Sequence, residues 1–154
     1  MSNELIVMFI SMLPISELRG AIPFAVGVYG MPVLTAFFWS VLGNIIPVIF
    51  ILWFLKAVSN FLSHRIYFFN RFFTWLFERT HRKYSKKIER RRDLALIVLV
   101  AIPLPFTGAW TGALAAFVFG IPIKRSFPLI ILGILIAGAI ISLTTIGIIS
   151  LPMI

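Results

Sequence analysis

The sequence contains no cysteine, two histidines and only five acidic residues among its 154 residues. Without cysteine there can be no disulfide, no thiolate metal site and no cysteine nucleophile. Both histidines, His64 and His81, fall in the central charged segment, so no histidine cluster is available for a metal ion. The apolar segments hold no paired carboxylates that could act as nucleophile and base. We therefore expect no metal, no cofactor and no enzymatic activity.

Charged residues are also scarce, at 12% of the chain, whereas hydrophobic residues make up 60%. A soluble domain has about 25% charged residues. The mean hydropathy of +1.05 agrees with this difference. The composition excludes a water-soluble globular protein and predicts an all-α integral membrane protein that crosses the bilayer more than once, because helices satisfy their own backbone hydrogen bonds in lipid.

Two segments are long and apolar enough to cross a bilayer as helices. Residues 33–55 make a run of 23 residues and residues 126–154 a run of 29, and neither run carries a charge. A spanning helix needs about 20 predominantly apolar residues. We predict transmembrane helices at 33–55 and 126–151.

Two further apolar regions are interrupted. Leu5 to Ser16 is a run of 12 uncharged residues, and such a helix rises only about 18 Å, short of a hydrocarbon core of roughly 30 Å. Residues 94–123 are longer but contain PLPFTG at 103–108, where proline removes backbone donors and glycine permits non-helical angles. We interpret both regions as re-entrant helical hairpins, with one long kinked helix apiece as the alternative. The residues expected to break the helices are Pro14, Gly20, Pro23, Pro103, Pro105, Gly108 and Gly112.

The breaks recur along the chain. A shift of 90 residues places Gly30 on Gly120 and Pro32 on Pro122, so the match preserves interruptions as well as hydrophobicity. Each half then reads as a hairpin followed by a spanning helix. The predicted single membrane domain, 1–154, consists of repeat one at 3–56 (hairpin 3–30, helix 33–55), a basic segment at 57–92 and repeat two at 93–154 (hairpin 94–122, helix 126–151).

The orientation of the two repeats follows from counting crossings. A hairpin returns to its own side and a spanning helix crosses once, so each repeat crosses an odd number of times and successive repeats are inverted. Paired, oppositely inserted broken helices are typical of secondary transporters. With the basic segment in the cytoplasm, both termini lie outside.

The basic segment carries most of the positive charge. Eleven of the 14 Lys and Arg residues lie between Lys56 and Arg92, the pattern of a cytoplasmic loop. Its aromatic residues suggest an interfacial helix against anionic headgroups. No recognition fold accompanies the charge, so we expect membrane lipids and no nucleic acid as partners. The residues expected to contact headgroups are Arg79, Arg82, Lys83, Lys86, Lys87, Arg90, Arg91 and Arg92.

Glu17 and Arg19 are the ionisable residues predicted inside the hydrocarbon layer, away from loops and ends. A charge there costs roughly 2.5–3.5 kcal/mol, so it usually has a partner or a function. Residues two apart point the same way in an extended segment, and the break at Pro14 would let both side chains share a site. Arg19 would hold an anionic headgroup, and Glu17 would neutralise it or exchange protons. The alternative is a permanent ion pair that fixes the hairpin.

The second hairpin offers uncharged groups. Thr107, Trp110 and Thr111 can donate hydrogen bonds near helix N-termini that favour anions, with plain turn chemistry as the alternative. Asn44, midway along the first spanning segment, could line a cavity or mediate helix packing, and packing is the favoured interpretation.

The segments SELRGAIP at 16–23 and PLPFTGAWTG at 103–112 resemble the small multidrug export protein family of prokaryotes, over nearly the whole chain. The resemblance implies efflux across a prokaryotic inner membrane. The hairpin-plus-helix repeat also resembles the broader DedA-type superfamily, whose members are linked to recycling of polyprenyl-phosphate lipids and to proton-coupled membrane homeostasis. Glu17 and Arg19 match its first-hairpin charged site. The second hairpin departs from that pattern, because residues 94–123 carry no charge.

The sequence thus predicts a small secondary-type transporter that moves an amphiphilic substrate, above all a lipid-linked phosphate, past Glu17 and Arg19. Because Arg19 offsets Glu17, the site suits a lipid phosphate better than a cationic drug. Efflux of lipophilic cations is the first alternative, and a non-transporting scaffold acting through the basic segment is the second. So short a chain often needs a second copy to enclose a pathway, so we expect a homodimer.

Overall fold

The structure, a computed structural model, describes residues 2–65, 68, 71–72, 74–75, 78 and 86–151, without the side chains of 62–63 and 86–88. Helices account for most of the described residues, which confirms the predicted all-α fold. The helices are α1 (Asn3–Met12), α2 (Glu17–Tyr29), α3 (Val33–Arg65), α5 (Lys86–Ala101), α6 (Ala109–Val118) and α7 (Ile123–Ser150).

α3 and α7 contain the membrane-length apolar stretches of the described chain, Val33–Phe61 with 29 residues and Ile123–Ser150 with 28. Both predicted spanning segments are therefore confirmed as helices of sufficient length. Each helix is longer than expected at the end near the basic segment. α3 continues to Arg65 because no proline or glycine follows Pro47. α7 begins directly after Pro122, whose fixed φ suits a helix start.

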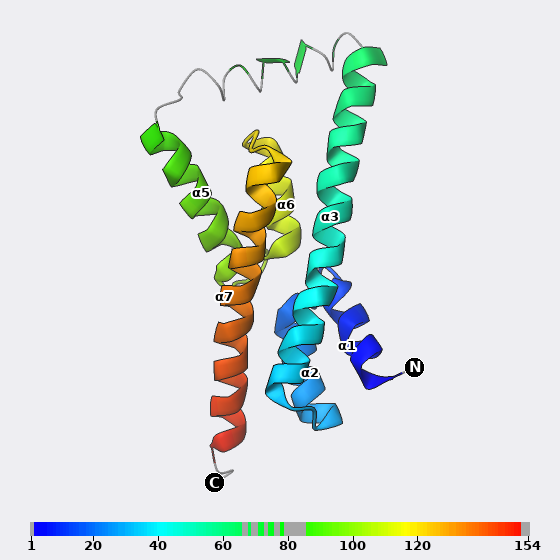
Figure 1. Cartoon of the computed structure of the whole chain (residues 1–154), viewed down its shortest axis with the longest axis vertical. Coiled ribbons are helices and arrows are strands. Elements are labelled where there is room, and N and C mark those ends of the chain that lie inside the picture. Colours follow the sequence, from blue (N-terminus) through cyan, green and yellow to red (C-terminus); the bar gives the residue numbers. More distant parts are fainter. Residues whose placement is uncertain are drawn as a thin grey trace.

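The shorter helices form two pairs at opposite ends of the molecule (Figure 1). α1 and α2 flank the first part of α3, whereas α6 lies between the later part of α3 and α7, and α5 packs against α7 and α6. Residues 13–16 connect α1 to α2, and residues 102–108 connect α5 to α6. Figure 1 shows the two connections near the middle of the long axis, each pair pointing its connection toward the other.

Several residues expected to break helices lie inside them instead. Gly20 and Pro23 belong to α2 and Gly112 belongs to α6, so these three do not interrupt a helix. Pro23 lies inside the 13-residue α2, where it removes the backbone hydrogen bond to the carbonyl of Arg19 without ending the helix. Pro14 lies in the first connection, and Pro103, Pro105 and Gly108 lie in the second.

α2 and α6 end in the same way. After α2, Gly30 has a left-handed φ of 61° and the amide of Met31 donates to the carbonyl of Ala25 at 3.1 Å. After α6, Gly120 has a φ of 68° and the amide of Ile121 donates to the carbonyl of Ala116 at 2.9 Å. Both are glycine C-caps, and a proline follows each.

The two halves of the chain interlock through their helices. α2 packs against α7, and α6 packs against α3, in addition to the contacts that each makes within its own half. The buried core accordingly draws residues from both halves, including Leu18 and Ile22 of α2 and Ala113 and Ala116 of α6. The connections are therefore positioned by the long helices of both halves.

Close packing of α1 against α3 depends on Gly43. A Cβ atom at this position would overlap the backbone carbonyl of Met8. The same pair of helices is joined by the Ser11 hydroxyl, which donates to the carbonyl of Ser40 at 2.6 Å. The backbones of α1 and α3 are therefore in close contact near Met8 and Gly43.

We expect Gly43→Ala to lower the free energy of unfolding by about 1–3 kcal/mol, because the methyl group must push α1 away from α3. Thermal unfolding in detergent micelles measures this change. Gly27→Ala is the matched control: it lies in α2 with open space around its Cβ position, so it should be neutral or slightly stabilising. Equal melting temperatures for the two variants would contradict the packing of α1 described here.

Candidate functional site

Arg19, in the first turn of α2, reaches across to the second connection. Its guanidinium donates hydrogen bonds to the backbone carbonyls of Leu104 and Thr107, and to the Thr107 hydroxyl at 3.0 Å. These carbonyls have no donors from a continuing helix, because Pro103 and Pro105 prevent α5 from extending beyond Ala101. A guanidinium suits this task because its donors are arranged in a planar fork.

The Thr107 hydroxyl forms hydrogen bonds with the backbone of the second connection. It donates to the carbonyl of Ile102 at 2.6 Å and accepts from the amide of Leu104 at 3.1 Å. Thr111, in the first turn of α6, donates to the carbonyl of Phe106 at 2.9 Å. Thr111 therefore stabilises the second connection by a hydrogen bond from α6, whereas Thr107 also binds Arg19.

Glu17, the first residue of α2, also contacts the opposite connection. Only 6% of this residue is exposed, and its Oε1 accepts a hydrogen bond from the backbone amide of Trp110 at 3.4 Å. Trp110 lies in the first turn of α6, where the backbone amides have no partners within the helix and the helix dipole favours negative charge. The carboxylate of Glu17 thus acts as a cap supplied by another helix.

Gly108 makes this approach possible. Its φ of 142° is in a region that favours glycine, and a Cβ atom there would overlap the carboxylate of Glu17. Trp110 adds a third link between the connections, since its indole Nε1 donates to the carbonyl of Met12 at 3.2 Å. Two non-glycine residues have a left-handed φ: Glu17, the first residue of α2, at 43°, and Phe106, in the second connection, at 67°. Such strain is typical of functional sites.

Glu17 and Arg19 are not joined to each other. The salt bridges found among the described residues belong to Arg125, which pairs with Asp93 at 2.6 Å and Glu89 at 3.2 Å. Arg19 instead binds the second connection, and Glu17 binds the N-terminus of α6. We refer to this set of contacts, made by Glu17, Arg19, Thr107 and Trp110, as the cross-connection clamp.

A small cavity lies beside the clamp, lined by Glu17, Arg19 and Asn44 among others. Its volume is about 10 Å³, which holds at most about one water molecule. Asn44 is 1% exposed, and its Oδ1 has no hydrogen-bond partner among the described residues. Asn44 therefore faces this cavity, but the cavity as it stands has no room for a substrate.

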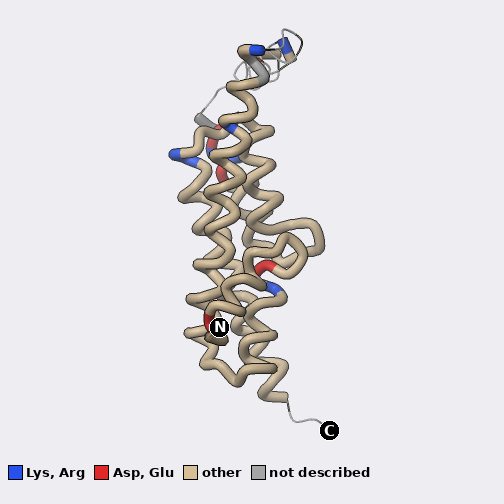
Figure 2. Tube along the Cα trace, turned by 90° about the vertical axis from the view of Figure 1, so that its right-hand side faces the viewer, with Lys and Arg blue, Asp and Glu red and all other residues tan. Residues whose placement is uncertain are grey.

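The described ends of the basic segment, in the last part of α3 and the first part of α5, lie at one end of the molecule. Figure 2 shows the charged positions gathered at this end, with further ones near the middle of the long axis. Arg90 and Arg91 are exposed on α5, and Arg92 is half-buried. Of the other residues expected to bind headgroups, Arg79, Arg82 and Lys83 lie outside the described residues, as do the side chains of Lys86 and Lys87.

Sequence reasoning missed some partners of the clamp. The carbonyls of Met12 and Leu104 bind Trp110 and Arg19, and a backbone acceptor leaves no signature in the residue type. The neighbouring prolines were the available signal. The sequence also gave no indication that Ser40 and Ser142 have buried hydroxyls without partners among the described residues. No group of three metal-binding side chains occurs in the part of the chain that the structure describes.

The described residues form an all-helical fold in which two apolar helices are long enough to cross a membrane, as expected of a small membrane protein. A family model described as "Putative small multi-drug export protein" matches residues 17–140, and the chain belongs to this family. The expected family is thus confirmed, and its description is that of an exporter, not of an enzyme. No curated protein and no solved structure gives a significant match.

We expect Arg19→Lys to lower the free energy of unfolding by about 2 kcal/mol, because a single ammonium cannot replace the forked donors to Leu104 and Thr107. Thr107→Val should cost about 1 kcal/mol. The double variant should lose less than the sum of both, since each change removes part of the same interaction. Denaturant titration in micelles measures all three values.

Arg91→Lys, on the exposed face of α5, is the matched control and should be neutral. Strictly additive losses at Arg19 and Thr107 would show that the clamp does not join them.

Proposed function

We propose that the protein is a small secondary-type transporter whose two repeats are inverted in the membrane, with α1–α2 and α5–α6 as re-entrant hairpins. Its substrate is an amphiphile with an anionic head, above all a lipid-linked phosphate, which passes between the hairpin connections. The observation that carries this proposal is the cross-connection clamp. It is built from the charged residues predicted within the hydrocarbon layer, and it closes the space between the two hairpins.

The inverted-repeat arrangement is supported by the matching ends of α2 and α6. Gly30 and Gly120, 90 residues apart, carry the same left-handed cap, and Pro32 and Pro122 follow them. The opposed directions of the two helix pairs in Figure 1 agree with it. With the basic end in the cytoplasm of a prokaryotic inner membrane, both termini lie outside. A second copy of the chain would complete the pathway as a homodimer.

The chemistry of the clamp favours an anion. Glu17 places a carboxylate at the N-terminus of α6, a position where phosphate also binds well. Arg19 donates to carbonyl oxygens that a phosphate oxygen can replace. A phosphate group could therefore take over both sets of hydrogen bonds as the connections separate. Protonation of Glu17 would weaken its hold on α6, which offers a route to proton coupling.

The family description favours a second candidate, efflux of lipophilic cations. In that case Glu17 would bind the cation after leaving α6, and Arg19 would have a structural role. A non-transporting scaffold acting through the basic segment is the remaining alternative, and it leaves the clamp without a function in transport.

Proteoliposomes loaded with a fluorescent short-chain polyprenyl phosphate test the proposal. We expect wild-type protein to accelerate its movement between leaflets, measured by chemical quenching from outside, and Arg19→Ala to reduce the rate at least tenfold. Glu17→Gln should also slow it, since the amide is a poorer cap for α6. Gly27→Ala is the matched control and should transport normally. Thermal unfolding verifies that each variant is folded.

The same vesicles distinguish the alternatives when a lipophilic cation replaces the phosphate lipid. Cation movement that is lost in Glu17→Gln and retained in Arg19→Ala would overturn the phosphate proposal in favour of drug efflux. No movement of either compound, in wild type or variants, would overturn transport altogether.

A further inference from the structure

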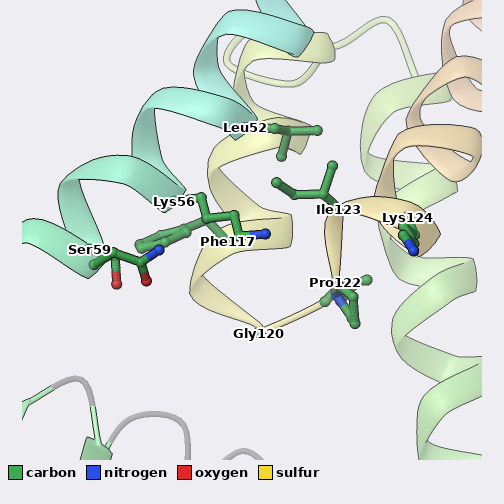
Figure 3. Close-up of a pocket in the computed structure, with 10 residues that line it drawn as sticks. Leu52, Lys56, Ser59, Phe117, Gly120, Pro122, Ile123 and Lys124 are labelled. Atoms are coloured by element: carbon green, nitrogen blue, oxygen red, sulfur yellow. The ribbon is translucent and has the colours of Figure 1, made fainter. Parts of the chain in front are cut away.

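An open cavity lies between α3 and the connection from α6 to α7 (Figure 3). Its volume is about 420 Å³, compared with about 10 Å³ beside the clamp. Small-molecule sites are usually about 300–1,000 Å³. This cavity is therefore large enough for a ligand in the conformation that the structure shows, whereas the space beside the clamp is not.

The charged residues that line this cavity have one sign. Lys56 of α3 and Lys124 of α7 line it, and none of its lining residues within the described part of the chain is acidic. Figure 3 shows Lys56 projecting from α3 toward the α6–α7 connection, with Lys124 across from it. Neither ammonium has an ion-pair partner among the residues whose structure is described, whereas the neighbouring Arg125 is paired with Asp93 and Glu89. Two such cations at one cavity favour an anion.

The remaining lining is graded from apolar to polar. Leu52, Lys56 and Ser59 follow one another on one face of α3 at helical spacing. Leu52 is buried, Ser59 is 7% exposed and Lys56 is exposed. Phe117 and Ile121 extend the apolar wall on the opposite side. Such a gradient fits a molecule with an apolar chain and a charged head.

We infer that this cavity binds the phosphate end of a phosphate-bearing amphiphile. Lys56 and Lys124 bind the phosphate oxygens, Ser59 offers a hydroxyl, and the first carbons of the chain lie against Leu52, Phe117 and Ile121. The site goes beyond the proposed function, because it requires neither transport nor separation of the clamp. If the phosphate lipid is also the transported substrate, this cavity is where it binds at the basic end.

Because the chain lacks cysteine, one introduced cysteine reports on the cavity without interference. Asn60 is exposed and lines the cavity, and its exposed neighbour Phe61 does not line it. We expect farnesyl phosphate to slow the maleimide modification of Asn60→Cys and to leave that of Phe61→Cys unchanged. The concentration that gives half protection measures the apparent Kd. Farnesol and inorganic phosphate, tested separately, should protect at least tenfold more weakly.

Charge variants in the Asn60→Cys background then test the two lysines. Lys56→Gln with Lys124→Gln should raise the apparent Kd for farnesyl phosphate at least tenfold. Arg90→Gln with Arg91→Gln removes the same charge from exposed positions at the same end, and should change the Kd less than twofold. Arg19→Ala, which tests the transport proposal, should leave protection at Asn60→Cys intact.

Several results would overturn the inference. An equal rise of the apparent Kd in the double lysine variant and the double arginine variant would indicate general attraction to a basic surface. Protection by farnesol equal to that by farnesyl phosphate would show that the phosphate does not contribute to binding. Equal protection by inorganic phosphate would show that the apolar chain does not contribute. Absence of protection by any probe would show that the cavity does not bind this class of ligand.

Discussion

The fold depends on how the unwound backbone between α5 and α6 finds hydrogen-bond partners within an apolar protein. Pro103 and Pro105 stop α5, so carbonyls of the connection lack donors from a continuing helix, and an unpaired backbone group in lipid costs several kcal/mol. Arg19 supplies donors to those carbonyls, and Glu17 accepts from the free N-terminus of α6. A charge in the hydrocarbon layer is itself unfavourable. Arg19 therefore adds to the hydrogen bonds of this connection, in which the carbonyl of Leu104 also accepts from the amide of Thr107 at 3.2 Å.

This dependence explains why the halves interlock. α2 carries Glu17 and Arg19 and packs against α7, while α6 carries the amide that Glu17 caps and packs against α3. Under the proposed mechanism, separation of the connections would move each short helix along the long helix of the other half. α7 also packs closely on its other neighbours through glycine: Gly133 meets Val100 of α5, and Gly138 meets Phe37 of α3. The left-handed backbone at Glu17 is strained in the observed arrangement.

The long helices, the all-α class and the family followed from the sequence, because uninterrupted apolar runs and two specific motifs determine them. Helix interruption was harder to predict. Pro14 and Pro103 lie in connections but Pro23 lies inside α2, so the residue type alone does not tell which proline ends a helix. Glu17 and Arg19 stood out as intramembrane charges, but their binding to the opposite connection, and not to each other, depends on tertiary contacts. The cavity at Lys56 and Lys124 combines residues 68 positions apart, and no sequence pattern joined them.

The contacts of the clamp also limit which ligands could open it under the proposed mechanism. The donors of Arg19 are occupied by carbonyls, and the N-terminus of α6 is occupied by a carboxylate, so a ligand that separates the connections must offer acceptors to both. Phosphate oxygens can do so, since they suit a guanidinium fork and a helix N-terminus equally well. A cation can pair with Glu17 but leaves the amides of α6 and the guanidinium of Arg19 without acceptors. The same argument applies at the basic end, where the open cavity presents two ammonium groups and no carboxylate. Both positions at which a ligand would meet charge therefore favour an anionic head.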